Sequence, residues 1–294
     1  MEDRKSIIHI PEGDIKTTGK IKIYPDGSQK IYAASKAVFH ENGWENSKDK
    51  PPAPARKQKP KEERTTEDIK RASRRAASKL RDYALCNEFR WFVTLTLDKS
   101  KVDRYDAEQI IKKMRVWLDN RVRRQGLKYL LVPELHKDGA IHFHGFFNDC
   151  DIGIECSGTY SIPGRKAPKK PKNEKEKQHF IDIGGKLVYN VLDWNFGFST
   201  AIELYGNYKA AVSYVVKYVS KAIEKIGGRW YYSGGALNVP EVVYADIDFR
   251  ELEADGACLF PVPGFALAIM EVEGDSCGNG CGISKSCGFI EPTD

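Results

Sequence analysis

The sequence predicts an α+β protein in which helices flank a central antiparallel sheet. Segments with the two-residue alternation of strands and segments with the apolar period of amphipathic helices follow each other along the chain. Two strand-like segments, residues 129–135 and 140–147, are separated by Lys137-Asp138-Gly139, which has the composition of a tight turn. Strands joined by so short a turn run antiparallel.

Length and composition set the outer limits. The chain has 294 residues, 41% of them hydrophobic and 30% charged, which suffices for one sizeable domain with appendages. A net charge of +6 favours a polyanionic partner. We find no apolar run of membrane-spanning length and no secretory pattern, so we expect a cytoplasmic protein without a membrane partner. The seven cysteines, an odd number, argue against a disulfide scaffold.

We expect four segments along the chain, each with its own composition. They are an N-terminal segment with a basic linker (1–64), a basic helix (65–87), a central domain (88–240) with an insertion loop (150–183), and a Cys-rich C-terminal extension that could be disordered (241–294). The first segment holds a small polar hairpin around Pro25-Asp26-Gly27, which is too short to form a domain.

A helix is predicted from about Thr65 to Tyr83, with Thr65 or Thr66 as its N-cap. Six of its residues are basic, and we interpret four of them as contacts to a phosphate backbone: Arg71, Arg74, Arg75 and Lys79. A solvated helix surface would explain the same charges equally well.

A strand at residues 89–97 and a helix at residues 106–124 come next. The helix has an apolar stripe that includes Ile110, Met114 and Trp117. Its other face is basic, and three residues near its end are further candidates for DNA contact: Arg121, Arg123 and Arg124.

The hairpin that follows carries a candidate metal site. Three of the six histidines of the chain fall within nine residues here. Side chains alternate between the faces of a strand. If residues 137–139 form the loop, with Gly139 left-handed, one face holds four polar side chains: Glu134, His136, His142 and His144. A two-residue turn would instead turn Glu134 away. Two imidazoles and a carboxylate can hold a divalent metal and leave room for a phosphate oxygen, although a bare His-x-His pattern also occurs in ordinary strands.

The remainder of the chain contains strands, one long helix and a tail. Strands are expected at residues 186–192, 198–204, 229–233 and 241–244. The helix is predicted from Tyr208 to about Ile226, with Asn207 as N-cap and Gly227-Gly228 as its stop. The tail contains Cys277-x3-Cys281-x5-Cys287, a spacing that favours a disordered thiol-bearing segment over a zinc knuckle.

The long helix carries a second constellation. Tyr214 and Tyr218 are four residues apart and therefore project from one face, which Lys221 and Lys225 continue. A tyrosine hydroxyl, with a pKa of about 10, is a poor nucleophile at neutral pH. It can attack phosphorus when a metal polarises the phosphate and cations such as Lys217 and Lys221 stabilise the developing charge. Tyrosines at the edge of a core, with solubilising lysines, would give the same pattern.

Three motifs, in this order, resemble those of the His-hydrophobe-His (HUH) endonucleases that initiate rolling-circle replication. The sequence is similar to the replication proteins of filamentous and microvirus-type phages and related plasmids. The motifs are Phe-Val-Thr-Leu-Thr-Leu-Asp at 92–98, His142-Phe143-His144, and Tyr214-x3-Tyr218-x2-Lys221. The resemblance covers roughly residues 85–240 and implies a sheet like that of RNA-recognition domains.

The resemblance also implies a metal ion, Mg²⁺ or Mn²⁺, on His142, His144 and a third polar residue. Glu134 fits the register given above, and His136 is its rival. The family's tyrosine attacks single-stranded origin DNA, stays linked to the 5′ phosphate and leaves a 3′ hydroxyl as primer.

The choice between the two tyrosines is close. Tyr218 is our first choice because the Tyr-x2-Lys element ending at Lys221 is the form found in single-tyrosine members, but Tyr214 has Lys217 at the same spacing. No GxxxxGK[ST] loop occurs in the sequence, so we expect a host helicase and polymerase as partners. Two alternatives stay open: a relaxase or single-strand transposase with the same chemistry, and a non-catalytic DNA-binding regulator.

Overall fold

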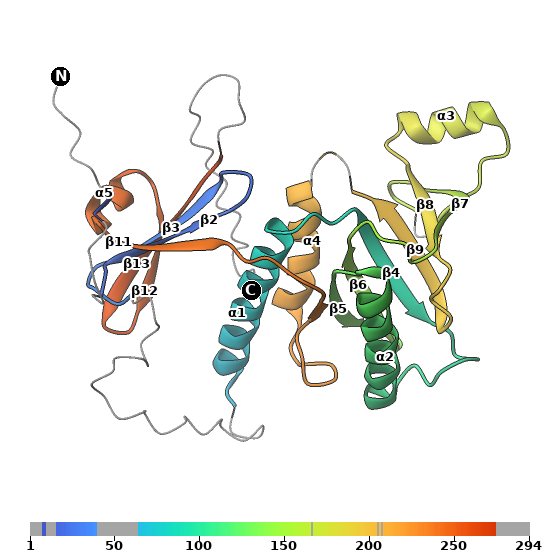
Figure 1. Ribbon diagram of the computed structural model, residues 1–294, viewed down its shortest axis with the longest axis horizontal. Helices are drawn as coiled ribbons and strands as arrows, with labels where there is room; N and C mark the ends of the chain where they lie inside the picture. The colour runs from blue at the N-terminus through green and yellow to red at the C-terminus, as the bar shows by residue number, and fades with distance from the viewer. Residues whose placement is uncertain are drawn as a thin grey trace. The chain divides into compact units, whose positions relative to one another are not determined.

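The computed structural model describes residues 8–9, 16–39, 64–165, 167–204, 206 and 208–274. Residues 64–239 form one compact unit, and the described residues before 40 and after 239 form another (Figure 1). Each unit contains an antiparallel sheet with helices, so the predicted α+β class is confirmed. Within the described residues, no helix has the length and hydropathy that crossing a membrane requires.

The larger unit is built on seven antiparallel strands. Their order across the sheet is β10-β5-β6-β4-β9-β8-β7. The strands are β4 (Trp91–Leu97), β5 (Tyr129–Leu135), β6 (Ile141–Phe147), β7 (Ile154–Ser161), β8 (Lys186–Val191), β9 (Gly197–Glu203) and β10 (Tyr232–Gly234). The predicted hairpin of residues 129–147 supplies β5 and β6 near the middle of this sheet.

Helix α2 (Ala107–Gln125) covers one face of this sheet. Asp106 caps its first turn, and Gly126, with φ of +68°, ends it in the left-handed conformation. The predicted apolar stripe of α2 packs against every second residue of β6, among them Phe143 and Phe147. These side chains leave almost no surface exposed, so this face is the main core of the unit.

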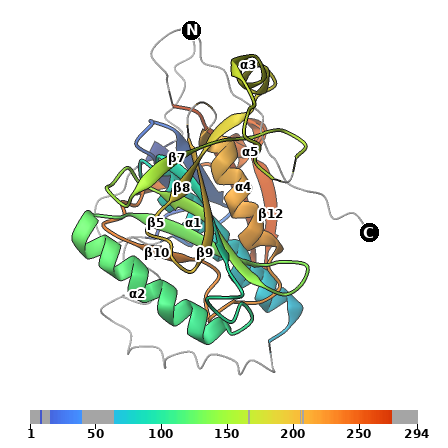
Figure 2. The same ribbon diagram turned by 90° about the vertical axis from the view of Figure 1, so that its right-hand side faces the viewer.

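Helices α1 (Thr66–Leu85) and α4 (Tyr208–Lys221) lie side by side on the other face. Figure 2 shows α2 and α4 on opposite sides of the strands. Thr65 caps α1 in a capping box with Asp68, as the sequence suggested. The hydroxyl of Ser73 on α1 donates to the carbonyl of Val219 on α4 at 2.6 Å, which fixes the two helices together. Their shared apolar side packs onto Phe146 of β6.

Strand register divides this second face into rows of side chains. Residues 130, 146, 92 and 202 form a row on neighbouring strands, and the first three of them contact the helices. The next row contains Val132, His144, Thr94 and Thr200, and the row after that contains Glu134, His142, Thr96 and Phe198. The histidines therefore lie beyond the apolar contact with α1 and α4.

Two parts of the larger unit differ from the sequence-based expectation. Residues 150–183, expected as an insertion loop, include β7 and helix α3 (Glu174–Asp182), which begins at the N-cap Asn173. Helix α4 ends at Lys221 rather than near Ile226. Lys225 is therefore not on the helical stripe, and its ammonium lies over the Trp230 ring instead. The expected N-cap, Asn207, lies outside the described residues.

The smaller unit joins the two ends of the described chain in one six-stranded sheet. Its order is β1-β11-β2-β3-β13-β12. The strands are β1 (Ile8–His9), β2 (Gly19–Ile23), β3 (Gln29–Ala34), β11 (Glu241–Ile247), β12 (Cys258–Val262) and β13 (Phe265–Val272), and helix α5 (Phe249–Ala254) packs against it. The small hairpin thus pairs with the C-terminal extension, where Thr18 and Ile247 exchange hydrogen bonds.

The cysteines fall into three groups. Cys86, Cys150 and Cys156 are free thiols, whereas Cys258 is disulfide-bonded and so is not available as the thiolate ligand that a zinc knuckle would need. Cys277, Cys281 and Cys287 lie outside the described residues, as does most of the expected basic linker.

Candidate metal and tyrosine site

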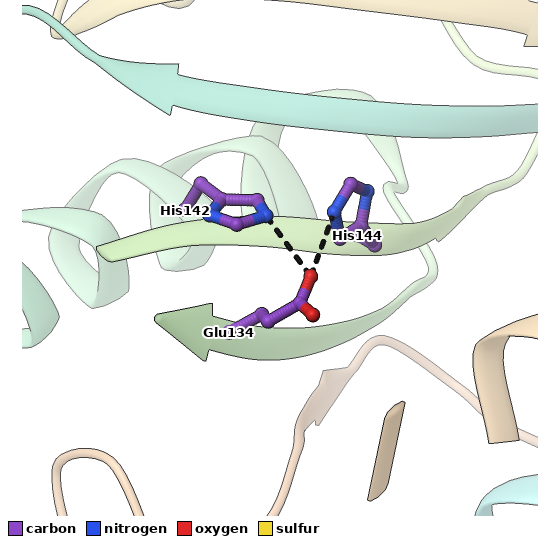
Figure 3. Close-up of side chains that lie close together, drawn as sticks. All are labelled: Glu134, His142 and His144. Atoms are coloured by element: carbon purple, nitrogen blue, oxygen red, sulfur yellow. Dashed lines mark hydrogen bonds and ion pairs between the residues drawn. The ribbon is translucent and has the colours of Figure 1, made fainter. Parts of the chain in front are cut away.

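Glu134, His142 and His144 converge on one point of the open sheet face. The Nε2 atoms of His142 and His144 lie 3.1 Å and 3.3 Å from the same carboxylate oxygen of Glu134. Figure 3 shows both imidazoles, from β6, directed toward the carboxylate on β5. One ligand atom from each residue lies within 4.8 Å of the other two, a spacing suited to a shared metal ion.

The turn chemistry explains this convergence. Gly139 has φ of +84°, the amide of Gly139 donates to the carbonyl of His136, and the amide of His136 donates to the carbonyl of Ala140. Residues 137–139 therefore form a three-residue loop that places Glu134 opposite His142. A glycine is suited to this position because a left-handed backbone strains residues with a Cβ. A two-residue turn would have placed Glu134 on the far face.

His136 lies beside this cluster rather than inside it. Its ring centre is 5.0 Å from that of His142, but the residue is exposed and is not among the three whose ligand atoms are mutually close. The structure thus brings Glu134, and not His136, together with the two predicted histidine ligands.

Burial keeps both imidazoles uncharged. Loss of solvent lowers the pKa of His142 to about 4 and that of His144 to about 3, and neighbouring histidines lower both further. Burial also raises the pKa of Glu134, which positive charge on His136 and Lys221 opposes. Neutral imidazole is the form that binds metals, so both histidines are ready to act as ligands at neutral pH.

Thr94 of β4 orients His144. Its hydroxyl oxygen lies 3.0 Å from Nδ1 of His144, the ring nitrogen that faces away from Glu134. With Nδ1–H donating to this hydroxyl, Nε2 keeps its lone pair for a ligand role. Sequence analysis included Thr94 in a motif without giving it a task, because its contact with His144 depends on the β4–β6 register.

Replacing Thr94 with valine is expected to weaken metal binding tenfold to a hundredfold, roughly the effect of losing an outer-shell partner of a histidine ligand. The measurement is calorimetric titration with Mn²⁺. Thr200→Val is the matched control, since Thr200 lies opposite Thr94 on β9 and should leave affinity within twofold or so. Equal affinities for the two variants would contradict an orienting role for Thr94.

The two tyrosines of α4 lie against the same histidine. The ring of Tyr218 stacks on that of His144, with centres 4.7 Å apart and planes 12° apart. The hydroxyl of Tyr218 donates a hydrogen bond to that of Tyr214. Phe92 supports the group from β4, with its ring 5.8 Å from Tyr214 and 6.2 Å from His144. Both candidate nucleophiles are therefore brought to the metal cluster, and Tyr218 is the closer to His144.

The environment of Tyr218 differs from that of Tyr214. Burial, the hydrogen bond to Tyr214 and the charge of Glu134 raise the pKa of Tyr218 well above its usual range. The phenol of Tyr218 is therefore protonated at neutral pH in the protein without metal. Tyr214 is half exposed. Lys217 and Lys221 are exposed on α4, and the charge of Lys221 acts on Glu134.

The predicted DNA-binding cations are divided between the two faces of the sheet. Four are exposed on α1, which shares the metal-bearing face: Arg71, Arg74, Arg75 and Lys79. Arg123 and Arg124 are exposed on α2, which covers the opposite face. Arg121 pairs with Asp193 at 2.9 Å and lies over the Trp117 ring. Its charge is thus already engaged by the fold, which the helical pattern alone could not reveal.

Comparison with known proteins adds one finding. Residues 90–223, just under half of the chain, match a family model of replication-associated proteins, the ORF2 type. The matched segment contains β4, the metal cluster and α4. Neither the curated proteins nor the solved structures yielded a match. This similarity supports a replication-associated protein that acts in the initiation of DNA replication.

Proposed function

We propose that this protein is a metal-dependent endonuclease that nicks and rejoins single-stranded origin DNA through a covalent 5′-phosphotyrosine, and so starts rolling-circle replication. The observation that carries the proposal is the stacking of Tyr218 on His144, directly above a cluster of two histidines and a carboxylate. A tyrosine hydroxyl and a metal-ligand set have no structural need to lie together, but phosphoryl transfer to tyrosine requires both.

Glu134, His142 and His144 would hold the metal, which we propose is Mg²⁺ or Mn²⁺. The fit rests on the close spacing of their ligand atoms and on the neutral state of both imidazoles. When bound, a divalent ion supplies the charge that polarises a phosphate oxygen. Carboxylate favours hard cations and imidazole favours later transition metals, so this mixed set is compatible with Mn²⁺ in particular.

The chain's own residues would perform the transfer. The oxygen of Tyr218 forms a bond to phosphorus while the bond from phosphorus to the 3′ oxygen breaks. The phenolic proton passes toward Tyr214, along their hydrogen bond, and on to solvent, and the released 3′ oxygen takes up a proton to become a hydroxyl. Lys221, with Lys217 a turn earlier, would stabilise the charge that develops on the phosphate.

Because one phosphodiester bond replaces another, its energy is retained and the strand can be resealed by the reverse reaction. Tyr214 is adjacent and could serve as a second nucleophile at termination. The cations of α1 would contact the phosphate backbone on the same side of the sheet. A host helicase and polymerase in the bacterial cytoplasm would unwind the duplex and extend the 3′ hydroxyl.

The test uses labelled single strands tiled across the genetic element that encodes the protein. Each strand is incubated with the protein and Mn²⁺, Mg²⁺ or EDTA, and the products are separated on denaturing gels. We expect one strand to give a metal-dependent protein–DNA adduct, which mass spectrometry assigns to a peptide of α4. Tight binding without an adduct on any strand would favour a non-catalytic regulator. Cleavage at transfer or excision sites, rather than at the origin, would favour a relaxase or transposase.

A further inference from the structure

We infer that Phe198 of β9 stacks against a base of the single-stranded DNA beside the metal cluster and so positions the strand for cleavage. Phe198 is 69% exposed, the most exposed phenylalanine among the large hydrophobic residues of the described chain. Exposure alone would not distinguish it, because isolated apolar residues are common on protein surfaces. Its position relative to the metal cluster does.

Strand register places Phe198 in the same row as two of the candidate metal ligands. Glu134 lies opposite His142, His142 opposite Thr96, and Thr96 opposite Phe198. Residues of one row point to the same face of the sheet. Neighbouring strands are about 4.8 Å apart, so Phe198 lies about 10 Å from His142 along this row. A strand bound at the metal would therefore pass over Thr96 and reach the ring of Phe198.

The backbone under Phe198 is held on both sides. β9 pairs with β4 along its whole length and with β8 at its second half. On the opposite face, Ser199 accepts a hydrogen bond from the amide of Val191 and donates one to its carbonyl. An aromatic ring on such a fixed strand is a suitable stacking surface, because every base presents a π-face whatever its sequence.

The inference rests on the proposed function for the identity of its ligand, so it is tested by binding without cleavage. The probe is a fluorescein-labelled, mixed-sequence single strand in EDTA, and anisotropy gives its affinity. Stacking on one base typically contributes ~1–3 kcal/mol, so Phe198→Ala should weaken binding about fivefold to a hundredfold. Phe198→Tyr keeps the ring and should bind like the wild type, whereas Phe198→Leu keeps only an apolar side chain and should bind like the alanine variant.

Val116→Ala is the matched control. Val116 is 59% exposed on α2, on the opposite side of the sheet, and its truncation should leave binding unchanged. Wild-type affinity in Phe198→Ala would overturn the inference, and so would wild-type affinity in Phe198→Leu. The adduct assay is independent of these results. If the wild-type protein forms no adduct and Phe198→Ala still weakens binding, the proposed nicking activity fails while the stacking role stands.

Discussion

Replacing both Tyr214 and Tyr218 with phenylalanine is expected to abolish the covalent protein–DNA adduct, a loss of at least about a thousandfold. The substitutions remove the two hydroxyls and little else, since the aromatic packing of Tyr218 on His144 and of Tyr214 on Phe92 can persist. Binding of single-stranded DNA should stay within about twofold of the wild type, because backbone contact depends mainly on cations. Denaturing gels measure the adduct, and anisotropy in EDTA measures binding.

The single variants separate the roles of the two hydroxyls. Tyr218→Phe should lose most of the first cleavage, because this ring lies directly on His144. Tyr214→Phe should still form the adduct, but more slowly, since Tyr218 loses its hydrogen-bond partner. Tyr105→Phe, an exposed tyrosine outside α4, is the control. An adduct that persists in the double variant would rule out both tyrosines as nucleophiles.

The core of the site could be predicted from sequence because its determinants are local. The turn Lys137-Asp138-Gly139 allows only a few registers, and the three-residue alternative places Glu134 and His142 on one face. Tyr214 and Tyr218 share a face of α4 through helical periodicity alone. What local patterns left open was the choice of turn, which the left-handed backbone of Gly139 decides.

The other features depend on contacts between segments far apart in the sequence. Thr94 reaches His144, and Phe198 joins the row of His142, only through the order β6-β4-β9 across the sheet. The pairing of β2 with β11 joins residues more than two hundred positions apart. No periodicity in either segment specifies such a partner, so the sequence suggested separate terminal segments where the structure has one sheet.

Glu134→Gln is expected to reduce Mn²⁺ affinity by more than about a hundredfold, beyond the usual effect of losing an outer-shell partner. The substitution keeps the size of the side chain and removes the negative charge that faces both Nε2 atoms at 3.1 Å and 3.3 Å. His136→Ala should change affinity only about twofold to tenfold, because that side chain is exposed at the edge of the cluster. Calorimetric titration with Mn²⁺ measures both variants.

Adduct formation gives a second, independent readout of the same comparison. If Glu134 is the third ligand, Glu134→Gln should need far more Mn²⁺ to form adduct, and His136→Ala should follow the wild-type curve. The melting temperature without metal shows whether each variant is folded, and only small shifts are expected, since Glu134 is partly and His136 largely exposed to solvent. A greater loss of affinity in His136→Ala than in Glu134→Gln would identify His136 as the third ligand. The hairpin would then have to rearrange on binding the metal, because the ring of His136 now lies outside the group whose ligand atoms are mutually close.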